Sequence, residues 1–294
     1  MERSLIQTRG EIVQGELVER RGFSPWQAAF VAIICVAIAA CEYVFAYQNV
    51  AYGIVIALAL TILIYLMLSI LHLDGRITNC GESLALIPLY ILFTSSLPWF
   101  FINQQYLLPA VYSCVLGLCL WHIYQKKLSL REIFGLESLK VRRFKGWGRW
   151  NFINLQIFKL VLMGLAIGIP LGMGEYFILY PTPAFPSFEV KYLLRDMVYM
   201  LCFVGLGEEL LFRGLIQRDM VSAFGWKWGL FGASAMFAVM HLTWRSIPEL
   251  GFVFLAGLIL GGLYLKTKSL VAPIVAHGVN NVILVSVLPY IFMR

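Results

Sequence analysis

Long apolar runs separated by short polar segments make up most of the chain from residue 26 onward. A helix needs about 20 mainly apolar residues to cross the hydrocarbon core of a bilayer, and most of these runs approach that length. The pattern predicts an all-α, polytopic membrane helix bundle with about nine spans, or eight if the short run 227–242 does not cross. The predicted runs are 26–47, 52–72, 84–102, 106–124, 152–173, 192–217, 227–242, 250–266 and 269–292.

Polar residues concentrate in residues 1–25 and 125–151. The second segment interleaves basic residues with Leu, Ile, Phe and Trp, a pattern typical of a helix in the membrane interface. Its excess of Lys and Arg places it in the cytoplasm, and counting spans back from it places the N-terminus there too. Glu175, just after the run 152–173, then falls in an external loop. We predict an N-terminal tail with accessory spans (1–124), a basic cytoplasmic interfacial linker (125–151) and a transmembrane core (152–294).

Composition supports a membrane protein and excludes a soluble domain. Of the 294 residues, 60% are hydrophobic and 13% are charged, whereas a soluble domain has about 25% charged residues. The net charge of +7 comes from basic residues in loops beside apolar segments, so it does not indicate nucleic-acid binding. We therefore expect a multi-pass protein of the cell membrane, surrounded by lipid, with no nucleic-acid partner.

Two adjacent carboxylates, Glu208 and Glu209, lie within the apolar run 192–217. Ionisable groups at membrane depth are costly, so each one needs a partner or a water-filled cavity. Successive residues of a helix are about 100° apart, which places Arg213 on the same face as Glu209 and points Glu208 elsewhere. The spacing predicts that Arg213 pairs with Glu209 while Glu208 stays available for chemistry.

Two histidines occur in later apolar runs, each with a partner four residues away. Phe237 precedes His241, and Asn281 follows His277, so each pair shares a helix face. One such polar residue in a membrane helix usually forms a hydrogen bond between helices. Three helices that all carry such residues favour a single functional site instead.

The three motifs resemble, in the same order, the signature of the CPBP family of intramembrane proteases. That family includes the type II CAAX prenyl endopeptidases and bacteriocin-processing or immunity (Abi-like) proteins. The likeness covers residues 190–292, and Leu130-Arg-Glu-Ile-Phe-Gly-Leu136 resembles the segment before the family's core. The resemblance implies an intramembrane endopeptidase with its catalytic core in the last four spans. Its substrate would be a membrane-associated peptide precursor or protein, including a prenylated CAAX protein.

The resemblance assigns roles that agree with the chemistry of peptide hydrolysis. Glu208 and His241 would activate a water molecule, and His277 and Asn281 would donate hydrogen bonds to the oxyanion. The supporting residues would be Glu209, Arg213 and Phe237. Glu208, His241 and His277 are also an alternative ligand set for zinc with an open fourth position. We favour the version without a metal and expect no cofactor.

Two interpretations from other classes stay open. The same charged residues would serve as the relay of a proton- or ion-coupled transporter. Against a transporter, the sequence contains no internal inverted repeat. A catalytically silent protein that binds peptides or membrane partners is the other alternative, although every catalytic position of the motifs is filled.

Overall fold

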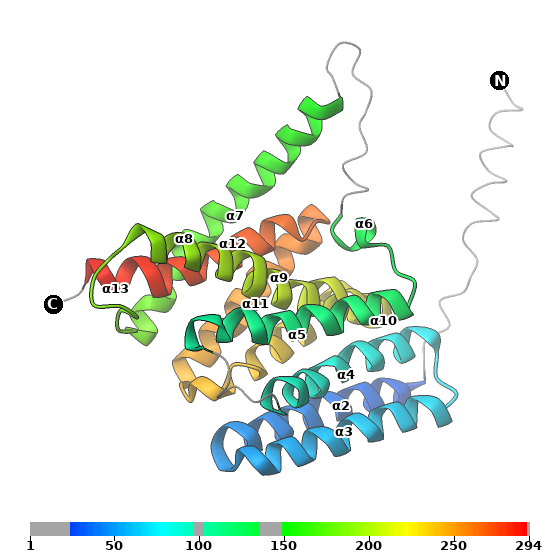
Figure 1. Ribbon diagram of the computed structural model, residues 1–294. Coiled ribbons are helices and arrows are strands. Elements are labelled where there is room, and N and C mark those ends of the chain that lie inside the picture. Colours follow the sequence, from blue (N-terminus) through cyan, green and yellow to red (C-terminus); the bar gives the residue numbers. More distant parts are fainter. Residues whose placement is uncertain (1–23, 97–102, 136–148, 293–294) are drawn as a thin grey trace, which may run out of the picture.

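The computed structural model describes residues 24–96, 103–135 and 149–292, and within them all regular structure is helical (Figure 1). This confirms the predicted all-α bundle. The longer helices are α2 (Pro25–Tyr43), α3 (Val50–Ile70), α4 (Gly75–Ser96), α5 (Gln104–Gln125), α7 (Arg149–Leu179), α8 (Val190–Tyr199), α10 (Arg218–Val239), α11 (Ile247–Thr267) and α12 (Val271–Val282). Single α-helical turns form α6 (Leu130–Ile133), α9 (Leu206–Glu209) and α13 (Leu288–Ile291). Four segments of the described ranges are π-helical, η1 (Val44–Gln48), η3 (Met200–Gly205), η4 (Leu210–Gln217) and η6 (Ile283–Val287), and η5 (Leu242–Trp244) is a 3₁₀ turn.

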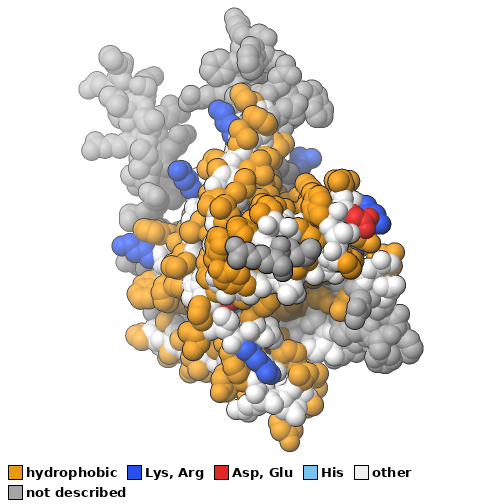
Figure 2. Space-filling view, turned by 90° about the vertical axis from the view of Figure 1, so that its left-hand side faces the viewer, with side chains coloured by type: hydrophobic (Ala, Val, Ile, Leu, Met, Phe, Trp, Pro, Cys, Tyr) orange, Lys and Arg blue, Asp and Glu red, His pale blue; other side chains and the backbone are white. Residues whose placement is uncertain are grey.

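Seven helices in the described ranges are long and apolar enough to cross a membrane. They are Pro25–Gln48, Val50–Ile70, Gly75–Ser95, Gln105–Gln125, Leu155–Leu179, Ile247–Thr267 and Val271–Ile291. The predicted runs 192–217 and 227–242 are not among them, so the count of nine is not established. Both runs lie in one helical segment from α8 to α10 that changes direction at Gly225, where φ is 82°. Figure 2 shows a surface that is mainly hydrophobic, with few charged side chains, as a multi-pass membrane protein requires.

Helix α4 begins at Gly75, nine residues before the predicted run 84–102. The prediction missed its first turns because they contain polar residues. The polar side chains of those turns have a partner at the end of the neighbouring helix α5. Lys126, directly after α5, forms an ion pair with Glu82 and a 3.0 Å hydrogen bond to Asn79. Hydropathy alone therefore predicted the start of this helix too late. Residues 97–102 of the run, and residues 136–148 of the predicted linker, lie outside the described part, and the division into three regions stays a prediction.

Glycines four residues apart bring α7 against α12. A Cβ atom on Gly164 would lie 2.6 Å from Cβ of Val275, and one on Gly168 would lie 2.4 Å from the carbonyl oxygen of Ala276. Gly172 continues the same stripe one turn later. Small residues allow helix backbones in a membrane to approach closely, so this stripe fixes where α12 lies.

A second close approach joins α12 to the segment around α9. A Cβ atom on Gly205 would lie 3.0 Å from the carbonyl oxygen of Ile274, and one on Gly278 would lie 2.5 Å from Cδ2 of Leu201. The α9 turn, which contains both adjacent glutamates, lies between the π-helical segments η3 and η4. Such π-helical irregularities occur frequently at functional sites. The chain thus presents its two carboxylates directly to α12.

The N-terminal helices are packed against this region rather than separate from it. Helix α5 contacts α4 on one side and α9, η3 and η4 on the other (Figure 1). Helices α2 and α3 pack in turn on α4. The accessory helices therefore form part of the surroundings of α9.

Candidate active site

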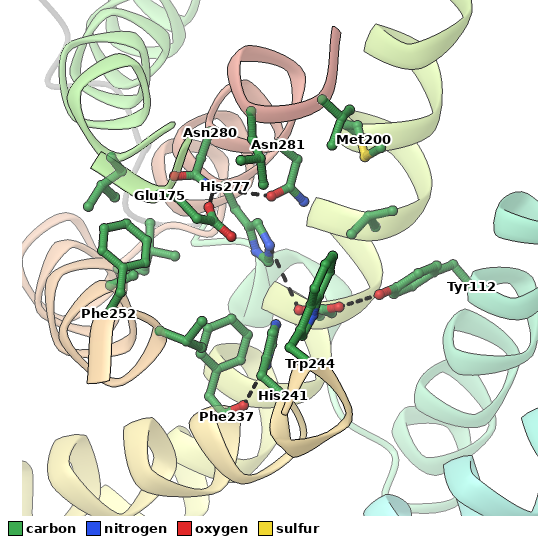
Figure 3. A pocket seen from close by; sticks show the side chains of 18 of the residues that line it. Tyr112, Glu175, Met200, Phe237, His241, Trp244, Phe252, His277, Asn280 and Asn281 are labelled. Carbon is green, nitrogen blue, oxygen red and sulfur yellow. Dashed lines mark hydrogen bonds and ion pairs between the residues drawn. The ribbon is translucent and has the colours of Figure 1, made fainter. Parts of the chain in front are cut away.

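A cavity of about 180 Å³ lies between α5, α7, α9, α11 and α12. Its wall contains all four residues that the sequence singled out for catalysis, Glu208, His241, His277 and Asn281. Figure 3 shows the two histidines and Asn281 around one common space, although His241 follows α10 while His277 and Asn281 lie in α12. Phe237 also lines this cavity.

The carboxylate of Glu208 has one oxygen held and one oxygen available. Its Oε1 accepts a hydrogen bond from the hydroxyl of Tyr112 in α5. Its Oε2 is buried and has no hydrogen-bond partner within the described residues. This second oxygen lies 3.7 Å from Nε2 of His277. A buried carboxylate oxygen without a donor, at the wall of a cavity, is a natural place for a water molecule.

His277 lies between the two adjacent glutamates. Its Nδ1 donates a 2.8 Å hydrogen bond to Oε1 of Glu209, while its Nε2 faces Glu208. Since a neutral imidazole has only one N–H group, Nε2 of His277 carries a proton only when the ring is an imidazolium. A donor role for His277 toward an oxyanion therefore requires the protonated ring.

The ion pair predicted from the i,i+4 spacing is present and completely buried. Arg213 lies 3.0 Å from Oε1 of Glu209, and these residues are 1% and 0% exposed. The guanidinium also donates a 3.4 Å hydrogen bond to the carbonyl oxygen of Gly257 and lies 4.3 Å from the centre of the Phe237 ring. Glu209 thus connects the arginine of η4 to His277 of α12, a contact that spacing along one helix does not predict.

His241 lies two residues after the end of α10, directly before η5, and its ring has a defined orientation. Its Nδ1 lies 2.9 Å from the carbonyl oxygen of Phe237, and because a carbonyl oxygen only accepts, Nδ1 carries the proton. In the neutral ring, Nε2 is then the nitrogen that can accept a proton or bind water. The Phe237 ring packs 4.8 Å from the His241 ring and 5.8 Å from the His277 ring, so it supports both histidines.

The amide of Asn281 is oriented by a chain of hydrogen bonds. Nδ2 of Asn280 donates to the Glu175 carboxylate and, at 3.1 Å, to Oδ1 of Asn281. Because Oδ1 of Asn281 accepts from its neighbour, its NH₂ group remains for a partner in the cavity. The position predicted to stabilise an oxyanion therefore presents a donor there.

Two residues of this site were missed from the sequence, Tyr112 and Glu175. Glu175 does not lie in an external loop as predicted: it is inside α7, 8% exposed, and lines the cavity. The apolar residues Phe177 to Leu179 after it were the signal that α7 continues. Tyr112 gave no signal, since it is one of 14 tyrosines and its contact with Glu208 is made between distant segments.

The geometry of the site does not support the alternative in which a zinc ion is bound. Among the described residues, no group of three or more His, Cys, Asp or Glu side chains is spaced to hold a metal ion. The set Glu208, His241 and His277 therefore does not fit a zinc ion as arranged, and we derive no step through a metal.

Comparison with known proteins bears on the segment that carries this site. Residues 191–283 match the family model of type II CAAX prenyl endopeptidase, Rce1-like. This segment is thus similar to that protease family over about a third of the chain. At the level of the family, the match indicates an intramembrane endopeptidase that acts on a peptide or protein. Every residue of the three sequence motifs lies within the CAAX-endopeptidase segment, whereas Tyr112 and Glu175 lie outside it.

One curated protein is similar to this chain at low sequence identity. An uncharacterized 24.3 kDa protein of Escherichia coli is 24% identical over 165 residues, which cover 54% of this chain and 70% of that protein. No solved structure matches the chain. The family match of residues 191–283 is therefore the comparison that bears on activity.

Proposed function

We propose that this protein is an intramembrane endopeptidase that hydrolyses a peptide bond of a membrane-associated substrate with a water activated by Glu208 and His241. The observation that carries the proposal is the unpaired Oε2 of Glu208. It lies at the wall of the cavity, and the cavity also contains both histidines and Asn281. Water bound to Oε2 of Glu208 and Nε2 of His241 would be next to the other proposed catalytic groups.

The reaction needs one base and one proton carrier. As the water oxygen attacks the scissile carbonyl carbon, Glu208 takes a proton from the water. The tetrahedral intermediate then collapses, the C–N bond breaks, and the same proton passes to the leaving nitrogen. The hydrogen bond from Tyr112 holds one carboxylate oxygen, so the other stays directed at the water. His241 keeps its Nε2 toward the water because its Nδ1 is bound to the Phe237 carbonyl.

The intermediate carries negative charge on the former carbonyl oxygen, which needs hydrogen-bond donors. The NH₂ group of Asn281 supplies one donor, in the orientation set by Asn280. The protonated ring of His277 supplies the second through Nε2, balanced by the carboxylate of Glu209. Loss of one such donor typically lowers kcat by about 10²–10³-fold.

The proposed substrate is a prenylated CAAX protein or a peptide precursor at the membrane. The proposed location is the cell membrane, with the N-terminus and the basic segment 125–151 in the cytoplasm. A transporter or a silent binding protein would use the same buried charges without hydrolysis. The paired histidines and the donor from Asn281 favour hydrolysis, because a proton relay requires no oxyanion site.

Hydrolysis in ¹⁸O-labelled water tests this function directly. Purified protein in liposomes is incubated with membrane-anchored peptides, and the products are examined by mass spectrometry. The proposal predicts new carboxyl termini that contain one ¹⁸O atom and no proton flux across the liposome membrane. Proton flux without any cleaved peptide would overturn the endopeptidase and favour the transporter.

A further inference from the structure

The cavity wall contains a second acidic group besides Glu208. Glu175 of α7 lines the cavity, and Glu249 of α11 lies against it with 0% of its surface exposed. In Figure 3, Glu175 faces the cavity from the side of Asn280, while Tyr112 approaches from the other side. The proposed hydrolysis uses neither Glu175 nor Glu249 as a reacting group.

This acidic group has an excess of hydrogen-bond acceptors. Both carboxylate oxygens of Glu249 and Oδ1 of Asn280 are buried without a hydrogen-bond donor from the described residues. Among the described residues, the one donor that reaches the group is Nδ2 of Asn280, which binds Glu175. A proton shared between Glu175 and Glu249 would still leave one negative charge and the amide oxygen of Asn280 unmatched. Buried acceptors and charges without partners are costly, so their persistence indicates a missing donor.

The described residues supply no positive charge to this place. Within the described residues, none of the ion pairs includes Glu175 or Glu249. The buried cations of the active site already have partners: Arg213 is bound to Glu209 and to the carbonyl oxygen of Gly257, and the proposed imidazolium of His277 is bound to Glu209. A cationic ligand in the cavity would supply this counter-charge.

We propose that Glu175, with Glu249 behind it, is a subsite for a cationic group of the substrate. The group is a lysine or arginine side chain or a free amino terminus, all of which carry several N–H donors and a positive charge. Asn280 joins this subsite to Asn281, the proposed oxyanion donor, so the cationic group lies within a few residues of the scissile bond. The inference rests on the proposed endopeptidase and adds that its substrates are basic near the cleaved bond.

Matched peptides test the subsite. Internally quenched peptides are prepared in pairs, with lysine or uncharged norleucine at one position, and the position is moved through four residues on each side of the scissile bond. Wild-type protein should cleave the lysine peptide with a kcat/KM about ten- to a hundredfold higher at one position, the range for a hydrogen bond to a charged group. Glu175→Gln keeps an acceptor for Asn280 but removes the charge, so the ratio should fall to about one. The readout is the ratio of the two rates and not either rate alone, because Glu175 also binds Asn280 and a loss common to both peptides cancels in the ratio.

Glu189→Gln is the matched control, because Glu189 is a partly exposed acid directly before α8 that pairs with Lys191. It should keep the full preference for lysine. A competition measurement needs no variant: n-butylammonium should inhibit wild-type cleavage of the lysine peptide competitively, and n-butanol should not.

The possible results separate the inference from the endopeptidase itself. If peptides are cleaved but no position prefers lysine, the subsite is wrong and the endopeptidase stands. If no peptide is cleaved by wild-type protein, the proposed function fails first. Equal loss of both peptides in Glu175→Gln would make Glu175 a positioning residue for Asn281 and overturn the subsite. If cleavage of the norleucine peptide depends on added Ca²⁺, Glu175 and Glu249 bind a metal ion instead, and the proposed subsite is also wrong.

Discussion

The hydroxyl of Tyr112 in α5 donates a hydrogen bond to Oε1 of Glu208 in α9, although the two residues are 96 positions apart. Tyr112 lies outside the CAAX-endopeptidase segment 191–283. One of the accessory helices therefore holds the carboxylate that we propose as the general base. Helix α5 is then part of the active site and not only a neighbour of it.

Replacement of Tyr112 by phenylalanine tests this contact. Tyr112→Phe removes the donor but keeps the ring, and the loss of a hydrogen bond to a charged group predicts a kcat about ten- to a hundredfold lower. KM should change little, because the peptide itself is not bound by this hydroxyl. Tyr106→Phe is the control, since Tyr106 is an exposed tyrosine of the same helix. An unchanged kcat in Tyr112→Phe would contradict the positioning role.

The Glu209–Arg213 ion pair should matter for stability as well as for activity. Arg213→Ala leaves the fully buried Glu209 without its cation, which predicts a loss of about 3–5 kcal/mol in the free energy of unfolding. Arg218→Ala removes the more exposed ion pair with Glu132 and should cost about 0–1 kcal/mol. Thermal unfolding in detergent micelles compares the two variants. Similar shifts in Tm would show that burial of the first pair has no energetic consequence.

The close contact of α7 with α12 should require a residue without a side chain at position 168, which is Gly168. Gly168→Ala would place a methyl group 2.4 Å from the carbonyl oxygen of Ala276, so the helices must separate. We expect a loss of stability of about 1–3 kcal/mol and lower activity, because α12 carries His277 and Asn281. Gly117→Ala in α5 meets open space and should leave Tm unchanged or slightly higher. A Gly168→Ala variant as stable as wild type would refute this packing.

Removal of metal ions is expected to leave the activity intact. The described residues offer no group of three His, Cys, Asp or Glu side chains with the spacing of a metal site. Dialysis against 1,10-phenanthroline, followed by metal analysis of the protein, should therefore leave kcat unchanged. Loss of activity that added zinc restores would establish a metal-dependent reaction and require Glu208, His241 and His277 to rearrange as ligands.

The features of the fold and site that depend on neighbouring residues in the chain could be predicted from the sequence. Apolar runs predicted the helical bundle, and the i,i+4 spacing predicted the pairing of Glu209 with Arg213 and of Phe237 with His241. The number of spans was less predictable, because the charges from Arg195 to Arg213 lower the hydropathy of the very segment that carries the site. Charged residues that are partnered in the fold look like loop residues in a hydropathy profile.

The remaining features depend on contacts between distant segments. Glu175 was predicted in a loop because an acid near the end of an apolar run usually faces water, whereas here Asn280 of α12 binds it. The hydrogen bond between Glu209 and His277 joins residues 68 positions apart, and neither helix alone indicates it. Such contacts require the relative placement of α7, α9 and α12, which the close approaches at their glycines determine.

Glu208→Gln in purified protein is the most direct test of the proposed chemistry. The amide keeps the size of the side chain and can still accept the hydrogen bond from Tyr112, but it cannot take a proton from water. We expect cleavage of an internally quenched peptide to fall by about 10²–10⁴-fold, the usual contribution of a general base, with Tm close to that of wild type. A Glu208→Gln variant that cleaves the peptide at the wild-type rate would contradict the central claim that Glu208 activates the water.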